Sequence, residues 1–346
     1  MSRNTGRAGV FPAALPLGLA GLAVIALACL AGPYPVSPEA VWRVLGQATG
    51  LARSAPTDPT LTAVVLDLRL WRAVLAYGVG AALAVAGGVF QGVLRNPLAD
   101  PFTLGVSGGA AFGAALSLTL GMTVALGRFA TPLYALLGGA GALGAVLALS
   151  RLGGGLRRET VVLAGIVTAT FLSALLSLVK ALNEESLAGI VFWIMGGFQG
   201  RGFASLTVFL PCFVVGAILI RVYIRELDIL LLGETQARQL GVATGRARLA
   251  LLTGASLLTA SAVAVSGVIG FVGLVAPHAC RRLYGAEHGR LLVLSALCGG
   301  ALLVLSDIAA RTMLPGGAEL PVGVVTALFG GPFFCFLLLS RQGRGA

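Results

Sequence analysis

Long apolar stretches alternate with short polar connections along nearly the whole chain. A membrane-spanning helix needs about 20 mostly apolar residues, and ten stretches meet or approach that length. The ten predicted spans are Val10–Gly32, Trp71–Leu94, Leu104–Leu126, Pro132–Leu149, Val161–Leu182, Phe203–Ile220, Leu249–Val268, Ile269–Leu283, Leu291–Ile308 and Pro321–Leu339. The pattern therefore predicts one all-α polytopic membrane domain over residues 1–346.

Glycine punctuates this pattern in two different ways. The seventh and eighth spans are separated only by Ser266-Gly267-Val268-Ile269-Gly270, which predicts a turn inside an unbroken apolar run. In the third span, Gly105, Gly109 and Gly113 recur at every fourth residue. Small residues at that spacing allow two helix backbones to approach closely, so we expect a close-packed helix face there.

Two connections are long enough to have functions of their own. Residues 33–69 contain five prolines and predict an ordered extracytoplasmic loop. Residues 221–248 are charged and amphipathic, and Gly233 and Gly241 bracket a short helical segment, so two small helices with a turn are expected. Such a segment either docks a cytoplasmic partner or lies on anionic lipid.

Composition supports the membrane assignment. The hydrophobic set makes up 57% of the chain and charged residues only 11%, against roughly a quarter in soluble domains. The chain also has 50 glycines, which suit helices packed closely in lipid. A water-soluble fold is excluded.

The formal net charge of +11 gives the chain an orientation. The basic residues are scattered arginines between apolar runs, without interleaved aromatics, so membrane topology explains them and nucleic acid binding does not. With ten spans and a cytoplasmic start, 16 of the 24 basic residues fall inside and both termini are cytoplasmic. The eight on the outer side are Arg43, Arg53, Arg69, Arg72, Arg128, Lys180, Arg201 and Arg311.

Bond-making chemistry finds little support in the sequence. Lys180 is the only lysine, so no Walker A loop can form, and any ATP must be hydrolysed on another chain. Of the two histidines, His278 lies near the inner end of a helix, where capping or packing explains it better than catalysis, and His288 falls in a cytoplasmic turn. The five cysteines have no Cys-x-x-Cys spacing, which favours core packing over disulfides or metal ligation. No cofactor or metal site is expected in this chain.

An ion-coupled carrier or a passive channel of similar helix count is the alternative to an ATP-driven transporter. Ion-coupled carriers place carboxylates near the bilayer midplane, whereas nearly all of the acidic residues here fall in connections or at helix ends. Asp307 is the exception, and it precedes Arg311 by four residues, a spacing that suits an ion pair near the outer surface.

Five ordered motifs together carry a resemblance to a known family. The chain resembles the permease subunits of type II ABC importers, which take up vitamin B12, haem and ferric siderophores, from about Leu66 to Leu339. The motifs are Leu68-Arg69-Leu70-Trp71-Arg72, Gln91-Gly92-Val93-Leu94-Arg95-Asn96-Pro97-Leu98-Ala99-Asp100-Pro101, the segment from Gly233-Glu234 to Leu240-Gly241, Gly270-Phe271-Val272-Gly273-Leu274-Val275-Ala276-Pro277-His278, and Glu319-Leu320-Pro321-Val322-Gly323.

The resemblance implies an assembly and a mechanism. It implies a homodimer of ten-helix subunits in the bacterial inner membrane, with helices 2–5 and 7–10 related as an inverted repeat. Two cytoplasmic ATP-binding cassette subunits would carry ATP and Mg²⁺, and a periplasmic or lipid-anchored protein would deliver the substrate. The cargo would be a metal chelate moved by alternating access at the homodimer axis. An iron complex is expected because iron chelates are the commoner cargo in the family.

The resemblance also implies site residues. Leu232, Gly233, Glu234, Ala237, Leu240 and Gly241 would couple to the ATPase, which displaces the lipid-surface interpretation. Arg69, Arg72 and Arg311 would dock the binding protein, because arginine offers a bidentate fork to a carboxylate. Trp71 stands where the family usually has proline, and Asp307 could hold Arg311 within the chain instead.

Two further roles follow from the fifth predicted span. The turn before it corresponds to the family's cytoplasmic gate, here Arg158, Glu159 and Thr160, although small hydroxyl residues are typical there. Lys180 lies near the outer end of the same span, which lines the family's translocation pathway. Its ammonium group either attracts an anionic chelate or reaches for the interface beside Glu184 and Glu185.

Overall fold

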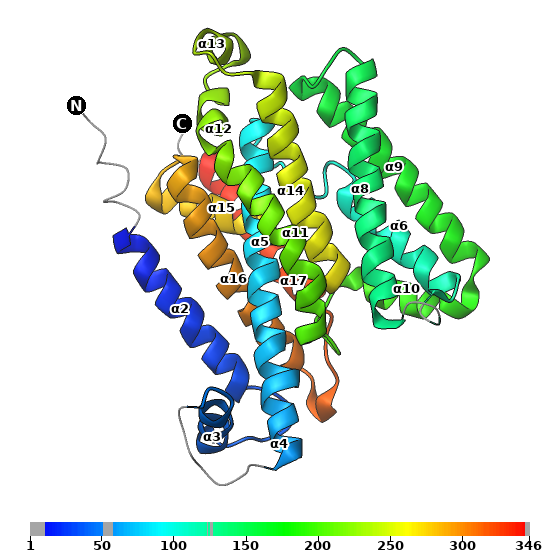
Figure 1. Cartoon of the computed structure of the whole chain (residues 1–346), viewed down its shortest axis with the longest axis vertical. Helices are drawn as coiled ribbons and strands as arrows, with labels where there is room; N and C mark the ends of the chain where they lie inside the picture. The colour runs from blue at the N-terminus through cyan, green and yellow to red at the C-terminus, as the bar shows by residue number, and fades with distance from the viewer. Residues whose placement is uncertain (1–10, 51–57, 123, 125–126, 343–346) are drawn as a thin grey trace.

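The computed structural model describes residues 11–50, 58–122, 124 and 127–342, and these form helices joined by short connections (Figure 1). The longer helices are α2 (Phe11–Leu30), α5 (Trp71–Val93), α8 (Ala130–Leu152), α9 (Arg158–Leu182), α11 (Phe203–Val222), α14 (Thr244–Ser266), α16 (His288–Thr312) and α17 (Val322–Gln342). The shorter elements are α3 (Pro38–Ala48), α4 (Pro59–Ala63), the π-helix η1 (Val64–Leu70), α6 (Val106–Thr119), α10 (Leu187–Met195), α12 (Ile224–Leu230), α13 (Glu234–Gln239), α15 (Val272–Tyr284), and the 3₁₀ helices η2 (Gly127–Phe129), η3 (Glu184–Ser186) and η4 (Pro315–Gly317).

Each of the ten predicted spans coincides with a helix of the structure. Within the described residues, seven helices are long and apolar enough to cross a membrane by themselves. The third and eighth spans are shorter than predicted, because α6 has 14 residues and α15 has 13. The predicted ends at Val10 and Leu126 lie outside the described residues. The predicted turn between the seventh and eighth spans is confirmed, since α14 ends at Ser266 and α15 begins at Val272.

The segment 33–69 contains more helix than its prolines predict. Pro38 and Pro59 each occupy the first turn of a helix, after the capping residues Ser37 and Asp58. Proline is tolerated in that turn because the amide hydrogen that it lacks would have no partner inside the helix. From Pro59 the helix continues without a break through η1 into α5, so Pro38 and Pro59 begin helices, whereas Pro33 and Pro35 lie in the connection before α3.

The helices pack as two interlocking sets. One set consists of α5, α6, α8 and α9, and the other of α14, α15, α16 and α17. In the first set α6, α8 and α9 pack on one another, and in the second α15, α16 and α17 do the same. Between the sets, α5 packs on α16 in the same way as α14 packs on α8. The short helices α6 and α15 each follow a residue of positive φ, Gly105 (73°) and Phe271 (68°) respectively. α5 and α14 run in opposite directions (Figure 1). This packing agrees with the predicted inverted repeat of helices 2–5 and 7–10.

The two ends of the bundle differ in character (Figure 1). α12, α13 and the connection between α8 and α9 lie at one end, at the top of the view. α3, α4 and η4 lie at the opposite end. The connections predicted to be cytoplasmic and extracytoplasmic are thereby separated, with the body of the bundle between them.

Candidate functional site

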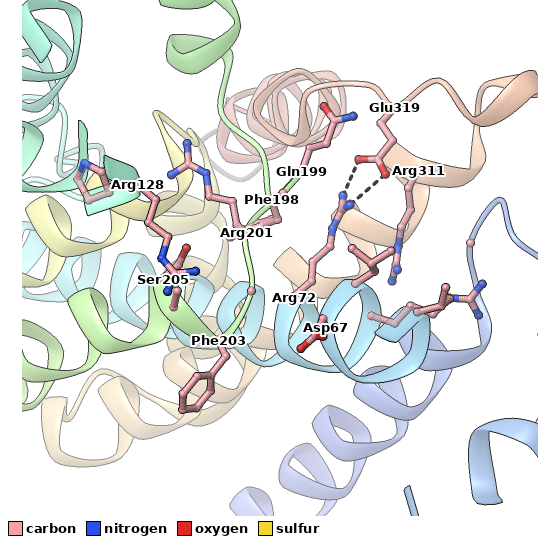
Figure 2. A pocket seen from close by; sticks show the side chains of 18 of the residues that line it. Asp67, Arg72, Arg128, Phe198, Gln199, Arg201, Phe203, Ser205, Arg311 and Glu319 are labelled. Atoms are coloured by element: carbon pink, nitrogen blue, oxygen red, sulfur yellow. Dashed lines mark hydrogen bonds and ion pairs between the residues drawn. The ribbon is translucent and has the colours of Figure 1, made fainter. Parts of the chain in front are cut away.

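A cavity of about 920 Å³ opens at the end of the bundle that carries α3 and α4 (Figure 2). We call it the outer pocket. Its lining comes chiefly from the α2–α3 connection, η1 and the start of α5, η2 and the start of α8, residues 198–205, and the region between α16 and α17. Its charged lining residues are Asp67, Arg69, Arg72, Arg128, Arg201, Arg311 and Glu319. Cations dominate this lining, so the pocket favours an anionic ligand.

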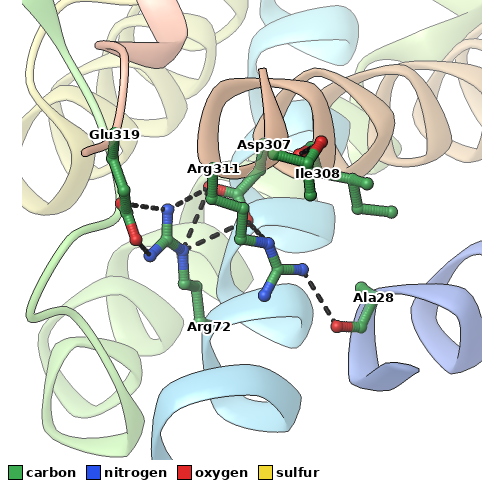
Figure 3. Close-up of polar contacts among 7 residues, drawn as sticks. Ala28, Arg72, Asp307, Ile308, Arg311 and Glu319 are labelled. Atoms are coloured by element: carbon green, nitrogen blue, oxygen red, sulfur yellow. Dashed lines mark hydrogen bonds and ion pairs between the residues drawn. The ribbon is translucent and has the colours of Figure 1, made fainter. Parts of the chain in front are cut away.

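Arg72 forms the centre of a buried ion-pair network in this pocket (Figure 3). Its Nη2 atom lies 2.7 Å from Asp307 Oδ1 and 2.9 Å from Glu319 Oε2. Its Nη1 atom donates to Glu319 Oε1 at 3.0 Å. The side chain of Arg72 is 7% exposed and that of Asp307 is 0% exposed. The network joins the start of α5 to α16 and to the segment that leads into α17.

Arg69 and Arg311 direct their guanidinium groups into the chain. Arg69 donates to the carbonyl oxygens of Cys29 (2.9 Å), Leu30 (3.0 Å) and Tyr34. Arg311 donates to the carbonyl oxygen of Ala28 at 3.0 Å, and its Nε lies 3.6 Å from Asp307 Oδ2. Each arginine is 3% exposed.

The structure thus brings together the three arginines predicted to dock a binding protein. It also engages all three in contacts within the chain. Asp307 lies nearer to Arg72 than to Arg311. The Asp307–Arg311 pair suggested by the i, i+4 spacing is therefore the longer of the two ion pairs that Asp307 forms.

Two arginines of the outer pocket were not singled out from the sequence. Arg128 is exposed and stacks over the Phe129 ring, with 5.3 Å from its guanidinium carbon to the ring centroid. Arg201 donates through Nη1 to the carbonyl oxygen of Val265 at 2.5 Å. Figure 2 shows both on the side of the pocket opposite Arg72 and Glu319. Their place among the few basic residues on the outer side was the signal that could have identified them.

At the opposite end lie residues 232–241, which include the residues predicted to couple to an ATPase and which we call the coupling segment. The two predicted small helices are present as α12 and α13, with Gly233 between them at a φ of +130°. Leu232 and Leu240 are 62% and 61% exposed, whereas Ala237 is fully buried. Gly241 ends the segment at a φ of +80°. Leu232 and Leu240 therefore form its exposed apolar surface, and Ala237 anchors the segment from inside.

Glu234 fixes the start of α13 through two arginines. Its carboxylate lies 2.6 Å from Arg238 Nη2 and 2.9 Å from Arg248 Nη1. Partial burial raises the pKa of Glu234, but the hydrogen bonds and charges of Arg248 and Arg238 outweigh it and hold the pKa below its ordinary value. The carboxylate is therefore charged at neutral pH, at the helix end where negative charge is favourable.

The predicted gate residues form the first turn of α9. Arg158 and Glu159 are exposed, whereas the Thr160 hydroxyl donates to the carbonyl oxygens of Gly155 (2.5 Å) and Arg157 (2.9 Å). Thr160 thereby ties the helix start to the preceding turn. Lys180 lies half-buried in the last turn at the other end of α9. The predicted gate and pathway residues are thus at opposite ends of one helix.

Metal-ligating side chains do not converge within the residues that the structure describes. No group of three or more His, Cys, Asp or Glu side chains is placed to hold a metal ion there. The arrangement offers a charged surface at one end and an apolar one at the other.

Comparison with known proteins gives consistent matches over most of the chain. The family model of the FecCD transport family matches residues 20–340. An uncharacterised ABC transporter permease protein of Bacillus subtilis, YvrB, is 44% identical over 96% of this chain and 95% of its own length. The cobalamin import system permease protein BtuC of Halobacterium salinarum is 40% identical over 95% of this chain and 91% of its own.

A solved structure agrees with these sequence matches. It is an inward-facing conformation of an ABC transporter of the metal-chelate type, and it superposes with a TM-score of 0.81 at 33% identity. The superposition covers 94% of this chain and 98% of that chain.

Proposed function

The chain belongs to the FecCD transport family of permeases of ABC importers for metal chelates, and we propose that it moves its cargo along the axis of a homodimer by alternating access. ATP is hydrolysed on a partner ATPase and not on this chain. The observation that carries the proposal is the separation of two surfaces. An apolar coupling segment lies at one end of the bundle and a cationic pocket at the other.

The proposal places the second copy of the chain against the outward face of α9. Only 22% of its most apolar stretch is buried within the chain. Leu163, Val167, Phe171 and Leu178 recur on one side of the helix and are between 51% and 64% exposed. A second copy of the chain would cover this face, and the first turn of α9 and Lys180 would then border the shared axis.

The two end surfaces fit two different partners. At the coupling segment, Leu232 and Leu240 offer apolar side chains to a groove of the ATPase. At the outer pocket, Arg128 offers an exposed guanidinium to acidic side chains of a substrate-binding protein. The same pocket is also lined by Arg69, Arg72 and Arg311. We propose that they contribute to docking by exchanging their partners within the chain for acidic side chains of the binding protein.

The membrane orientation follows from these partners. We place the coupling segment and both termini in the cytoplasm of a bacterial cell, with the outer pocket on the extracytoplasmic side of the inner membrane. The charge distribution supports this placement, because most arginines fall in the connections on the coupling side.

The cargo is a metal chelate, and we propose an iron complex. Family frequency favours an iron complex, whereas a relative 40% identical to this chain is a cobalamin permease. Affinity is expected to reside in the binding protein, because a pathway that held the chelate tightly would release it slowly.

Transport by the reconstituted importer tests the function. In proteoliposomes that contain this chain, its ATPase and its binding protein, we expect uptake of haem, a ferric siderophore or cobalamin to require ATP. Leu240→Asp should abolish this uptake together with co-purification of the ATPase, because a charge replaces an apolar contact. Leu283→Asp is the matched control, since Leu283 is 72% exposed in the last turn of α15, outside the coupling segment.

Two results would contradict this assignment. Uptake that continues without the ATPase and follows an ion gradient would identify an ion-coupled carrier. Normal uptake by Leu240→Asp would remove the coupling segment from the ATPase interface.

Lys180 is proposed to attract carboxylate-bearing chelates at the outer end of the axis. Lys180→Ala should slow uptake of such a chelate on the order of tenfold at low salt and less at high salt, because electrostatic steering is screened by ions. Lys180→Arg, which keeps the charge, should transport normally. Equal rates for the alanine variant and the wild type at low salt would leave Lys180 with an interfacial role only.

A further inference from the structure

Arg248 lies between the coupling segment and the turn that precedes α9. It belongs to the second turn of α14, and its side chain is 9% exposed. Its Nη1 atom donates to Glu234 Oε2 at 2.9 Å and to the carbonyl oxygen of Leu156 at 2.9 Å. One buried nitrogen therefore joins two segments that are 78 residues apart in the sequence.

On the coupling side, Arg248 connects Glu234 of α13 to a different helix, α14. Glu234 is the first residue of α13, and its other arginine partner, Arg238, belongs to the same helix. Arg238 is also 67% exposed, whereas Arg248 is buried. A displacement of α13 therefore acts on Arg248 through an ion pair whose arginine is buried and whose carboxylate is 31% exposed, so water screens it less than the pair with Arg238.

On the other side, Leu156 belongs to a tight turn, residues 153–157, which we call the α8–α9 turn. Gly155 donates to the carbonyl oxygen of Ser150 at 2.9 Å, and Arg157 donates to that of Gly155 at 2.8 Å. The Thr160 hydroxyl binds both Gly155 and Arg157 from the first turn of α9. Because the turn is bonded to the helix start, movement of Leu156 moves the N-terminus of α9.

Arg248 carries the link across α14, which packs on α12 and α13 on one side and on α6 and α8 on the other. α9 packs mainly on α6 and α8, and α14 stands between these helices and α12 in Figure 1. Arginine suits the position because its guanidinium presents several fixed donors at once, whereas lysine offers a single ammonium on a flexible stem.

We propose that Arg248 is the positioning residue that transmits movement of the coupling segment to the start of α9. The proposal rests on the proposed function, in which α13 follows the ATPase and the first turn of α9 forms the cytoplasmic gate. Nucleotide-driven displacement of Glu234 pulls on Arg248, Arg248 carries Leu156 with it, and the gate residues follow.

The test uses the complete importer in proteoliposomes with the variants Arg248→Lys and Arg246→Lys. Both replace an arginine of α14 by lysine, but Arg246 is exposed and lies outside the coupling segment, whereas Arg248 is bonded to Glu234 and Leu156. For Arg248→Lys we expect ATP hydrolysis and assembly to persist, with roughly tenfold less substrate transported per ATP, within the usual range for coupling between two sites. Arg246→Lys should transport as much per ATP as the wild type.

A second readout follows the gate itself. Arg157, which is exposed in the α8–α9 turn, is replaced by cysteine after the exposed Cys335 has been changed to serine. We expect ATP to change the rate at which a water-soluble maleimide labels this cysteine when residue 248 is arginine, and to leave that rate unchanged when it is lysine. A purely structural role for Arg248 would not remove the dependence on nucleotide.

The outcomes separate the two proposals. If the wild-type importer does not couple ATP to uptake, the proposed function fails. If it does, and Arg248→Lys matches Arg246→Lys in both readouts, the role of Arg248 is overturned. Where Arg248→Lys does not assemble, Glu234→Gln breaks the charged contact from the other side, and normal coupling by that variant would equally overturn the proposal.

Discussion

Replacing Gly138 by alanine is expected to lower the melting temperature and the yield of folded protein strongly. A Cβ atom at Gly138 of α8 would lie 2.1 Å from the carbonyl oxygen of Gly109 in α6, and one at Gly109 would lie 2.3 Å from that of Gly138. The obstacle is backbone, so no side chain can rotate away and the two helices must separate. Overpacking of this kind typically lowers the free energy of unfolding by about 1–3 kcal/mol, and a backbone obstacle puts Gly138→Ala at the upper end of that range.

The same helix supplies the control. Gly141 is one turn further along α8, and a Cβ atom there would meet nothing within 4 Å. Gly141→Ala should be neutral or stabilise by about 1 kcal/mol, since alanine favours a helix over glycine. Thermal unfolding and the yield of monodisperse protein in detergent distinguish the two variants. Equal melting temperatures for Gly138→Ala and Gly141→Ala would show that the helices are not in contact along this face.

The sequence predicted this close approach because small residues at every fourth position are a local signal. Gly109 and Gly113 do lie against α8, where a Cβ atom at Gly113 would be 2.1 Å from the Tyr134 carbonyl oxygen. Gly105 has a different role, since its φ of 73° begins α6 and its neighbour is Ala169 of α9. A glycine needed for helix packing and one needed for a turn look the same in the sequence.

Contacts between distant segments were beyond prediction from a single sequence. Local spacing paired Asp307 with Arg311, yet Arg72, 235 residues away, is the closer partner. Which face of α5 meets α16 depends on the packing of the whole bundle. The link from Glu234 through Arg248 to Leu156 is of the same kind. Proline gave an ambiguous signal because it is common both in turns and in the first turn of a helix. At Pro59 it begins α4, although the sequence predicted a loop.

Replacing Arg72 by methionine is the other change expected to have a large effect. The variant leaves Asp307, which is fully buried, and Glu319 without their common cation. Removing one member of a buried ion pair costs about 3–5 kcal/mol, because the remaining charge stays out of water. Arg311 cannot take over without moving, since its Nε is 3.6 Å from Asp307. Arg72→Met should therefore lower the melting temperature sharply.

Arg238→Met measures what an exposed ion pair of similar length contributes. Arg238 lies 2.6 Å from Glu234 but is 67% exposed, so its loss should cost no more than about 1 kcal/mol. Binding of the substrate-binding protein, measured on the same preparations, then separates the two roles considered for Arg72. A lowered melting temperature for Arg72→Met would assign Arg72 to the internal ion-pair network. A variant that keeps its melting temperature and loses only the binding protein would assign Arg72 to docking, because an internal network cannot lose its cation without losing stability.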